Sequence, residues 1–494
     1  MLEIPLQYEL PENLKATKFI AQLSEIANVQ IVSQQYAIKA FYDSFDWRLY
    51  RDNKTFEFNQ AQSTSHVNLI DRNSGNLLAT EELDNVPDFA EEFSAGDLRT
   101  HLISPLGMRA LLPLCQLPHE IYRANILDKE QQTIAQIQID EYEFLTNRVS
   151  LKLENANEAD LKHLSDIFQN TLELQPAQNL TALNSALKQQ GRKPKNYSSK
   201  IDIKLNPEMS ADKASKKIFK HLLQIMRVNE ADIIVGTDAE FLHDFRVAVR
   251  CTRVGLNQIK HTLPASIVTE YADFFSWLGQ VTGPTREMDV YLLKYQQYQA
   301  VLPVELHEDI APLYDFLQQK QILAQSELAE KLNSVKYRKQ LSAWEQCLNE
   351  AFPAEESGRN ANMNIKALAD QRIWKVYKRF IKEASLIGEY SKPETLHDLL
   401  KTGKKLRYLM LFFKNLYPES EMKTLSKSLK VFLSVLADFQ DYEVQEVNIK
   451  KFSKEMDVNA PPINTFVAMD VLTQYLNNKK FSSRNDFLSA VCGF

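Results

Sequence analysis

Cysteine is scarce in this sequence, and the four cysteines lie far from one another. No two of them form a Cys-x-x-Cys pair. The chain therefore lacks both the ligand spacing of a zinc site and the cysteine density of a disulfide framework. This usage fits a protein of the reducing cytosol. The four residues are Cys115, Cys251, Cys347 and Cys492.

Long apolar runs are also missing. The longest one, from Tyr408 to Phe413, is far too short to span a bilayer. The first residues, MLEIPLQYELPE, are acidic and do not combine a basic region with an apolar one, so we expect no signal peptide. These features predict a cytoplasmic protein without a membrane partner.

Glycine is scarce as well, at 12 of 494 residues. The apolar fraction of 44% and the charged fraction of 25% are typical of a soluble globular protein. The length predicts two or more domains. Because long charged and amphipathic segments dominate the second half while glycine is rare, we expect that half to be helical.

Neither sign of charge dominates the whole chain, but the two halves differ. Residues 1–200 carry 19 basic and 27 acidic side chains, whereas residues 201–494 carry 39 and 37, within a formal net charge of −6. A nearly neutral second half is not typical of a nucleic-acid-binding domain, so we expect no nucleic-acid partner. Its basic residues are clustered, however, and local clustering is what attracts a polyanion.

The first 190 residues show the period-two alternation of half-buried strands, separated by polar turns. This pattern predicts an α+β domain with an antiparallel sheet over residues 1–190. Residues 87–115 are expected to be mostly helix and loop. The strand-like segments are 1–10, 31–43, 47–58, 65–71, 119–127, 132–140 and 146–154, and the helical ones are 12–28, 157–170 and 179–190.

Residues 191–206, GRKPKNYSSKIDIKLN, have the composition of a linker between domains. The pattern that follows, over residues 207–480, is helical and predicts an all-α domain. Its helices are expected to end at Gly and Pro residues. The candidates are 210–228, 238–261, 266–282, 286–301, 304–332, 336–351, 364–388, 393–416, 419–438, 440–455 and 463–476.

One of these helices contains the stretch FLHDFRVAVRCTRVGLNQIK at residues 241–260. His243, Arg246, Arg250 and Arg253 stand at spacings 0, 3, 7 and 10, which places them within an arc of roughly 80° on a helix. The adjoining face is apolar. One side of the helix can therefore be buried while the other presents a histidine and a row of arginines. An isolated stripe of this kind is usually only a solvated helix face.

The stretch occurs twice, however. A shift of 154 residues places His243 on His397, Arg250 on Lys404 and Arg253 on Arg407. This internal repeat predicts that the helical domain is a duplication, with copies at about 207–340 and 361–480 that pack about a pseudo-twofold axis. With one residue of slippage the shift also relates the first helix of each copy, Lys217-Ile218-Phe219-Lys220 to Arg372-Ile373-Trp374-Lys375.

The two copies are not equivalent. Arg246 corresponds to Leu400, and the second copy has Lys401 and Lys405 instead. Both side-chain types bind phosphate, arginine as a fork and lysine as a point charge. We expect the face at 243–253 to bind an anion more tightly than the face at 397–407.

Several further residues have more than one interpretation. Arg286 can form an ion pair with Asp289 or a helix cap, and it can also contact an anion. Secondary candidates on the first helix of each copy, each of which can equally be solvated, are Lys217, Lys220, Arg372 and Lys375.

The histidines also allow two readings other than anion binding. His243 and His397 can be satisfied core residues. Alternatively, their pairing with Asp244 and Asp398 suggests a metal phosphohydrolase, which would require further His and Asp ligands from other helices.

The pattern His243-x-x-Arg246-x-x-x-Arg250-x-x-Arg253, followed by Gly279, Gly283 and the segment 286–290, resembles the CHAD family, the conserved histidine α-helical domain. The second copy begins at His397 and ends at Arg407-Tyr408. The resemblance covers about residues 207–480. It implies two pseudo-symmetric helical bundles with a basic cleft between them, and binding of inorganic polyphosphate. It also implies association of some members with polyphosphate granules.

The order of elements in residues 1–190 resembles the CYTH family of triphosphate tunnel enzymes, which implies an antiparallel β-tunnel-like domain. The family's ExExK motif corresponds to Glu3-Ile4-Pro5-Leu6-Gln7, and a YYDT-like segment survives as Phe41-Tyr42-Asp43-Ser44 with Arg48 after it. The family's later tunnel strands correspond to Thr55-Phe56-Glu57-Phe58 and to residues 66–71 and 149–154. A triphosphate tunnel needs several carboxylates for the metal ion and several cations for phosphate. Most of that set is replaced, which indicates a degenerate domain.

The sequence therefore predicts a protein that binds polyphosphate, or a similar polyanion, through a basic surface shared by both helical copies, without a required cofactor. The alternatives are a divalent-metal triphosphatase in the first domain and a protein-interaction scaffold. A divalent metal is expected only if the first domain is active. The oligomeric state stays open.

Overall fold

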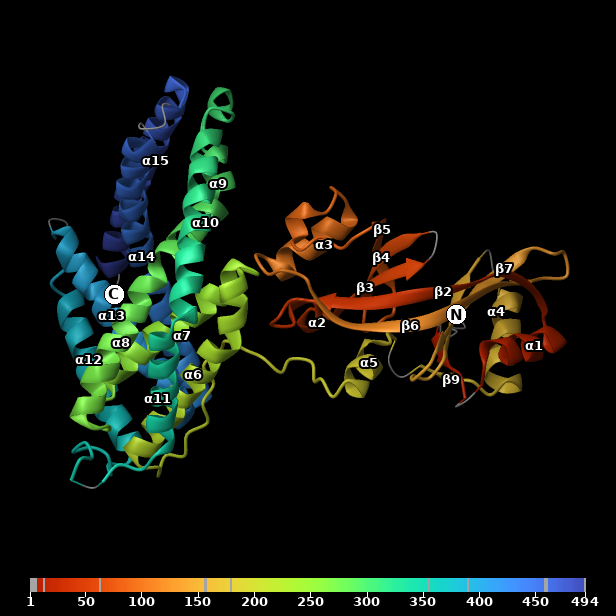
Figure 1. The fold of residues 1–494 in the computed structure, drawn as a ribbon, viewed down its shortest axis with the longest axis horizontal. Helices are drawn as coiled ribbons and strands as arrows, with labels where there is room; N and C mark the ends of the chain where they lie inside the picture. Colours follow the sequence, from red (N-terminus) through yellow and green to blue (C-terminus); the bar gives the residue numbers. More distant parts are fainter. Residues whose placement is uncertain are drawn as a thin grey trace. The chain divides into compact units, whose positions relative to one another are not determined.

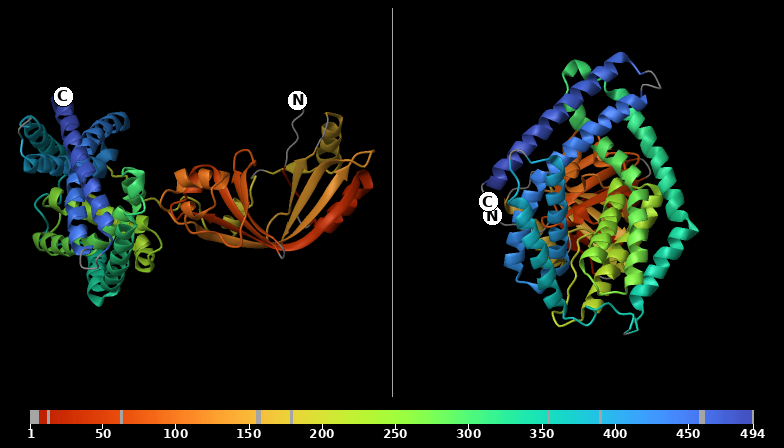
Figure 2. Two further views of the ribbon diagram at one scale, coloured as in Figure 1. Left: turned by 90° about the horizontal axis from the view of Figure 1, so that it is seen from above. Right: turned by 90° about the vertical axis from the view of Figure 1, so that its left-hand side faces the viewer.

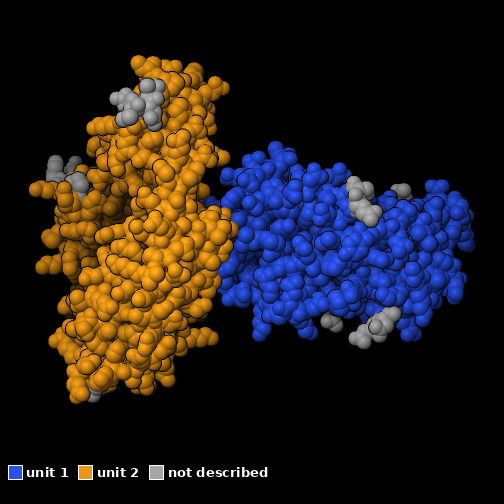
Figure 3. Space-filling view, viewed as in Figure 1, with its two compact units in different colours: residues 1–198 blue, residues 199–494 orange. Residues whose placement is uncertain are grey.

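The structure is a computed structural model of the chain, and it divides the chain into two compact units, residues 1–198 and 199–494 (Figure 3). Each unit is described by itself. The described residues are 7–11, 14–61, 64–154, 158–177, 180–353, 355–388, 391–456 and 461–492.

The first unit contains a nine-stranded sheet in the order β5-β4-β3-β2-β6-β7-β8-β1-β9. All neighbouring strands are antiparallel, and the sheet is strongly curved (Figure 2). The predicted α+β fold with an antiparallel sheet is confirmed. The strands are β1 Gln7–Glu9, β2 Asn28–Asp43, β3 Lys54–Ala61, β4 Ser65–Asp71, β5 Leu77–Glu82, β6 Leu112–Leu127, β7 Thr133–Tyr142, β8 Arg148–Leu153 and β9 Gln175–Pro176.

Helices cover the outer face of this sheet at two places. Phe19 and Leu23 of α1 pack with Ile137 of β7 and with Phe168 in one apolar core. A second core joins strands β3 and β4 to α3. The helical elements are α1 Ala16–Ile26, α2 Arg48–Arg51, the 3₁₀ turn η1 Ala90–Glu92, α3 Asp97–Leu106, α4 Glu158–Ser165, the π-helical turn η2 Asp166–Thr171 and α5 Leu183–Gln189.

Three expectations for this unit were wrong in detail. The strand expected at 47–58 is divided, because α2 occupies its first half and is capped by the buried carboxylate of Asp43. Strand β5 was not expected, since its own sequence, LLATEE, lacks a clear alternation of apolar and polar residues. Strand β6 begins at Leu112, inside the segment predicted as helix and loop, because it pairs along the whole length of β2.

The second unit is helical throughout its described length, as predicted (Figure 1). Its helices are α6 Ala211–Val235, α7 Ala239–Gln258, α8 Ala265–Val281, α9 Gly283–Ala300, α10 Ala311–Asn333, α11 Val335–Asn349, α12 Ile365–Ala384, α13 Pro393–Phe413, α14 Glu419–Met456 and α15 Ile463–Cys492. Short 3₁₀ turns are η3 Val304–Leu306 and η4 Lys414–Leu416.

The same order of helices recurs in both copies. Helix α6 packs on α7 as α12 packs on α13, and the paired helices α9 and α10 correspond to the second part of α14 and to α15. These last four helices share one apolar core, in which Tyr291 packs against Phe452. The two copies lie side by side, one coloured yellow-green to teal and the other blue (Figure 2).

The second copy departs from the predicted boundaries. The helices expected at 419–438 and 440–455 form one continuous helix, α14, because no Gly or Pro interrupts the sequence there. The first copy has Gly283 and Pro284 at the equivalent place, where α8 ends and α9 begins. Helix α15 continues to Cys492 rather than ending at 476. Among the described residues, every helix is too short or too polar to be a candidate for a bilayer-spanning segment.

Candidate anion-binding site

Helix α7 holds the first row of cations. Its first turn is capped by the Asp238 carboxylate, which accepts hydrogen bonds from the backbone N–H groups of Glu240 and Phe241. Phe245 and Val249 are buried on one side of the helix, whereas Arg250 and Arg253 are exposed. The predicted division into an apolar and a basic face is therefore present.

Three arginines of the first copy are held by uncharged oxygens. Arg246 donates to the Gly279 carbonyl at 3.0 Å and to the Thr282 hydroxyl at 2.6 Å. Arg253 lies 3.4 Å from the Ser276 hydroxyl, and Arg286 donates to the Ala239 carbonyl at 3.2 Å. These contacts orient the guanidinium groups without neutralising them, because none of the partners is a carboxylate.

Of the two glycines near the junction of α8 and α9, Gly279 allows an arginine to lie close to the helix, whereas Gly283 leaves ordinary contact distance. A Cβ atom at Gly279 would lie 3.0 Å from Nη1 of Arg253, and one at Gly283 would lie 4.0 Å from Nη1 of Arg246. At Gly279 that separation is tighter than most real contacts of a Cβ atom. The close approach of Arg253 is therefore a steric reason for glycine at position 279.

Burial and neighbouring positive charges lower the pKa values of side chains on this face. The pKa of Arg246 is lowered to about 10, chiefly by burial and then by the neighbouring Arg250, Arg286 and Arg253. Burial and then Arg286 hold the pKa of His243 below its ordinary value. His243 is therefore neutral near pH 7 in the free protein, while the arginines stay charged.

Helix α13 adds the second set of cations, and it packs directly against α7. Burial lowers the pKa of Lys404, and Arg250 of α7 is the next cause, followed later by Arg407. Arg250 also lies close enough to Tyr408 to affect its hydroxyl. The basic faces of the two copies therefore meet at the contact between α7 and α13, around Arg250 and Lys404.

Acidic side chains partly neutralise the second copy. His397 Nε2 lies 3.5 Å from a Glu443 carboxylate oxygen, and Lys401 is paired with Asp398 at 3.1 Å. The Asp441 carboxylate of α14 raises the pKa of Lys404, against the effect of burial and of the arginines. Lys405 is half-buried, and Leu400, which replaces Arg246, is buried.

Four of the predicted residues lie outside the cluster around Arg250. Lys217 donates to the Lys204 carbonyl, and Arg372 donates to the Gln258 carbonyl at 2.7 Å, at the far end of α7. Lys220 lies near Lys216, and Lys375 is exposed on α12. The structure therefore connects none of these four to the cluster around Arg250.

The expected ion pair between Arg286 and Asp289 is absent from the part of the chain that the structure describes. Asp289 is buried and accepts a hydrogen bond from Gln321 at 3.1 Å. Burial raises its pKa to about 6. Because Arg286 instead donates to the Ala239 carbonyl, its remaining N–H groups are available to an anion.

The metal-hydrolase reading gains no support. Over the described residues, no group of three or more His, Cys, Asp or Glu side chains could hold a metal ion. Arg286 has the largest effect of a charged neighbour on His243 and would repel a cation there, although Glu240 and Asp244 act in the opposite direction.

The first unit has a separate polar cavity of about 230 Å³ on the inner face of its sheet. Lys39 of β2 is buried there, 3.0 Å from Asp140 and 3.8 Å from Glu57. Burial opposes the charge of Lys39, but the two carboxylates and Tyr142 hold its pKa well above the ordinary value. Arg148 in the same cavity pairs with Glu9 at 3.4 Å. Lys39 and Arg148 therefore have acidic partners already, whereas Arg123, which also lines the cavity, donates to the Gln138 amide oxygen at 3.3 Å.

The sequence interpretation identified only part of this cavity. It named Glu57 and Gln7, which both line the cavity, but it missed Lys39, Asp140 and Arg148. The signal was present in the alternating polar positions of β7 and β8, such as Gln138 and Asp140. The predicted motif residues Glu3 to Leu6 lie outside the described residues.

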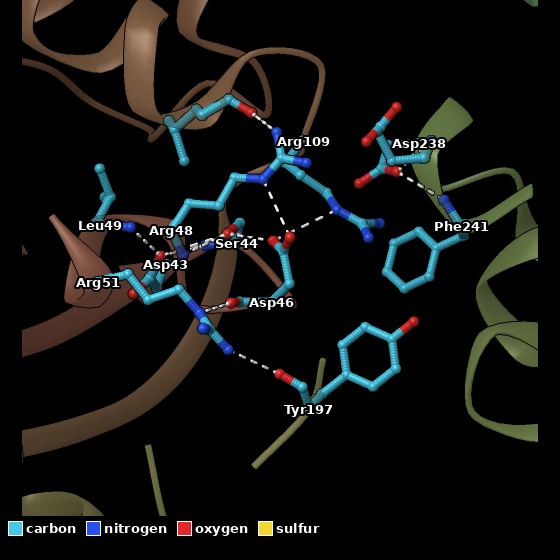
Figure 4. A network of polar contacts seen from close by, with 12 residues as sticks. Asp43, Ser44, Asp46, Arg48, Leu49, Arg51, Arg109, Tyr197, Asp238 and Phe241 are labelled. Carbon is cyan, nitrogen blue, oxygen red and sulfur yellow. Dashed lines mark hydrogen bonds and ion pairs between the residues drawn. The ribbon is translucent and has the colours of Figure 1, made fainter. Parts of the chain in front are cut away.

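The YYDT-like segment has a structural role. The buried Asp43 carboxylate accepts hydrogen bonds from the backbone N–H groups of Ser44, Leu49 and Tyr50 (Figure 4). Burial raises its pKa to about 6, against the effect of those bonds. Asp46 next to it pairs with Arg48 at 3.1 Å and with Arg109 at 3.4 Å. These contacts fix α2 at the end of β2.

The helical unit is similar to a known domain family. Residues 217–449 match the family model of the CHAD domain, which confirms the predicted resemblance. The crystal structure of the CHAD domain from the plant Ricinus communis is similar at 20% identity and a TM-score of 0.50, covering 60% of this chain and 96% of that chain. This similarity shows that the helical unit has the fold of that domain.

Two further solved structures are similar over parts of the chain. PptA from Streptomyces chartreusis has 12% identity and a TM-score of 0.42, covering 57% of this chain and 98% of that one. A Hippeastrum protein, HpAC1, described as having a dominant triphosphatase activity, has 14% identity and a TM-score of 0.29, covering 40% and 100%. No curated protein is significantly similar to this chain.

Proposed function

We propose that this CHAD-domain chain binds inorganic polyphosphate, or a polyanion of similar charge spacing, at the cluster formed by α7 and α13. The cluster consists of His243, Arg246, Arg250, Arg253, Arg286, Lys404 and Arg407. One observation carries the proposal. Among the described residues, none of its five arginines is in an ion pair with a carboxylate, whereas Arg227 and Arg379 elsewhere in the unit are paired with glutamates.

The chemistry of the cluster suits a chain of phosphates. Such a chain carries roughly one negative charge per phosphoryl unit and has no bases to stack. Arginine forks bind phosphate oxygens in pairs, and several of them in a row can follow a linear anion. Sites for single-stranded nucleic acids add aromatic side chains between the cations. Here Tyr408 is the aromatic residue that lies beside Arg250.

The two copies contribute unequally in this proposal. Arg246, Arg253 and Arg286 of the first copy contact uncharged oxygens, whereas His397 and Lys401 of the second copy have acidic partners. The first copy would therefore supply most of the attraction. Lys404 and Arg407 would extend the site across the contact between the helices.

The interaction requires no cofactor, because the opposite charges are on the two partners themselves. A bound anion would also favour protonation of His243, which would add a further donor. Binding of this kind would recruit the protein to polyphosphate granules.

The test is a titration of long-chain polyphosphate into the full chain at several salt concentrations. Arg250→Glu combined with Arg407→Glu should abolish measurable binding, and wild-type affinity should fall steeply with salt because binding releases counterions. A matched control is Arg338→Glu with Lys339→Glu, two exposed cations on α11 of the same unit. The assigned surface is wrong if the first double variant binds as tightly as the wild type and the control.

A further inference from the structure

The second copy of the helical unit has an open apolar groove between α12 and α14, with α13 as its floor. Its volume is about 810 Å³. The side chains of Trp374 and Leu425, on opposite sides of the groove, are each 56% exposed. Exposed apolar surfaces of this kind mark interaction sites. Other lining residues include Tyr377, Ile381, Met410 and Phe432.

The corresponding groove of the first copy is filled by helix α11. The shift of 154 residues places Tyr271 on Leu425 and Phe275 on Leu429, and with the one residue of slippage in the first helix it places Phe219 on Trp374. In the first copy, Trp344 of α11 packs against exactly these three counterparts. Its ring centroid lies 5.5 Å from that of Phe219, 4.4 Å from that of Tyr271 and 5.7 Å from that of Phe275.

Helix α11 shows which features such an occupant needs. Its buried side chains, Tyr337, Leu341, Trp344 and Leu348, stand at spacings 0, 4, 7 and 11, which is one face of a helix. It runs antiparallel to α6 (Figure 1). Near its start the Tyr337 hydroxyl donates to Glu230, and at its end the Glu350 carbonyl accepts from Lys216.

We propose that the groove between α12 and α14 binds an amphipathic helix of a partner protein, seated as α11 is seated in the first copy. The helix would carry an aromatic, an aliphatic, an aromatic and an aliphatic residue at the spacings of α11. Helix-in-groove recognition uses such a stripe of anchors. The described residues of this chain leave the groove open along that stripe.

The charges around the groove specify the partner further. Among the described residues that line it, only Asp370 and Glu421 are charged, and Asp370 is already paired with Lys366 at 2.6 Å, which leaves Glu421 to attract a cation of the partner. Asp370 and Glu421 correspond to Ser215 and to Ile267, which lie near the first turns of α6 and α8, and α11 terminates beside the first turns of α6. The partner helix should therefore have a lysine or arginine near its C-terminal end, where a cation also suits the helix dipole.

A second charge lies at the other end of the groove. Lys382, which is exposed, corresponds to Arg227, and Arg227 contacts the Glu345 carboxylate of α11 at 3.4 Å. The partner helix should therefore have a carboxylate next to its central aromatic residue, as α11 has. The groove is formed by α12 and α14 rather than by the arginine cluster, so this proposal does not depend on polyphosphate binding.

The probe is a fluorescein-labelled peptide with the sequence of residues 335–350, carrying Cys347→Ser and Glu350→Lys. Anisotropy is measured as the full-length protein is added. Saturable binding is expected, and Leu425→Glu or Trp374→Lys in the protein should weaken it at least about 10-fold, as for a buried anchor. A peptide that keeps the natural Glu350 should bind about two- to five-fold more weakly, as for the loss of an exposed ion pair.

The matched control is Val431→Glu, which changes a 59% exposed valine on α14 outside the groove and should leave affinity within two-fold. A peptide with Trp344→Ala should bind as weakly as the wild-type peptide binds to Leu425→Glu. The proposal is overturned if no saturable binding occurs, or if both groove variants bind like the wild type, since the peptide would then occupy another place. Self-association of the wild type that Leu425→Glu abolishes would make a second copy the occupant, and would also overturn it.

Discussion

Replacing Arg250 with glutamine should weaken polyanion binding while leaving the fold at least as stable. Arg250 is exposed at the contact between α7 and α13, and its charge lowers the pKa values of His243, Arg246 and Lys404. No ion pair with a carboxylate involves it in the part of the chain that the structure describes. Its charge therefore repels the neighbouring cations in the free protein, and in the proposed function it would attract the bound anion.

The size of the effect follows from the contacts that would be lost. A hydrogen bond to a charged group contributes about 1.5–3 kcal/mol, so the loss of one phosphate contact should weaken binding by about 10- to 100-fold. The slope of log K against log salt should become smaller by about one. Relief of repulsion among exposed like charges should change the free energy of unfolding by on the order of 0.5 kcal/mol, in the stabilising direction.

Isothermal titration with polyphosphate at three salt concentrations, together with thermal unfolding of the free protein, measures both effects. Arg338→Gln on α11 is the control for loss of one exposed arginine, and it should change neither quantity. The reasoning is refuted if Arg250→Gln unfolds at a clearly lower temperature, since Arg250 would then be a structural residue. It is also refuted if affinity and salt slope match those of the control.

Three other predictions concern different groups. Burial and nearby arginines lower the pKa of His243 in the free protein, and a bound anion would raise it. Affinity should therefore increase as the pH falls through and below about 6.5, the ordinary pKa of histidine. Titrations at pH 5.5 and 7.5 should show this gain in the wild type and a smaller gain in His243→Gln. Gly279→Ala should displace the Arg253 guanidinium, whose Nη1 would lie 3.0 Å from the new Cβ; we expect a few-fold loss of affinity with unchanged or slightly higher stability, because alanine favours a helix by about 1 kcal/mol, and an unchanged affinity would show that Arg253 is not needed. Lys39→Met should destabilise the first unit by about 3–5 kcal/mol, because Asp140 and Glu57 would be left buried without their cation; chemical denaturation checks this, and Lys152→Met, an exposed lysine on β8, is the control.

The sequence determined much of this molecule through periodicity and repetition. The period of two in residues 31–43 and 65–71 predicted strands, and the spacing of His243, Arg246, Arg250 and Arg253 predicted one basic helix face. Both depend only on local geometry, which the order of residue types encodes directly. The internal repeat extended the prediction to a second basic helix, since duplicated sequences fold into equivalent elements.

Turns and helix ends were less predictable because contacts distant in sequence decide them. The buried cap that Asp43 forms on α2 interrupts a segment with strand-like composition. The long pairing of β6 with β2 converts residues around Leu112 into strand. Lys39 and Asp140 lie 101 residues apart in the chain, and only the closing of the sheet brings them together.

The sequence by itself thus determined which helix faces are basic and that they occur twice. Only the tertiary structure decided which cations share a site. The packing of α7 on α13 places Arg250 beside Lys404, whereas the secondary candidates Lys217 and Arg372 bind backbone carbonyls elsewhere. The physical reason is that local periodicity fixes the direction of a side chain on its own helix. The partner that it meets depends on how whole helices pack, and this depends on apolar contacts spread over the entire unit.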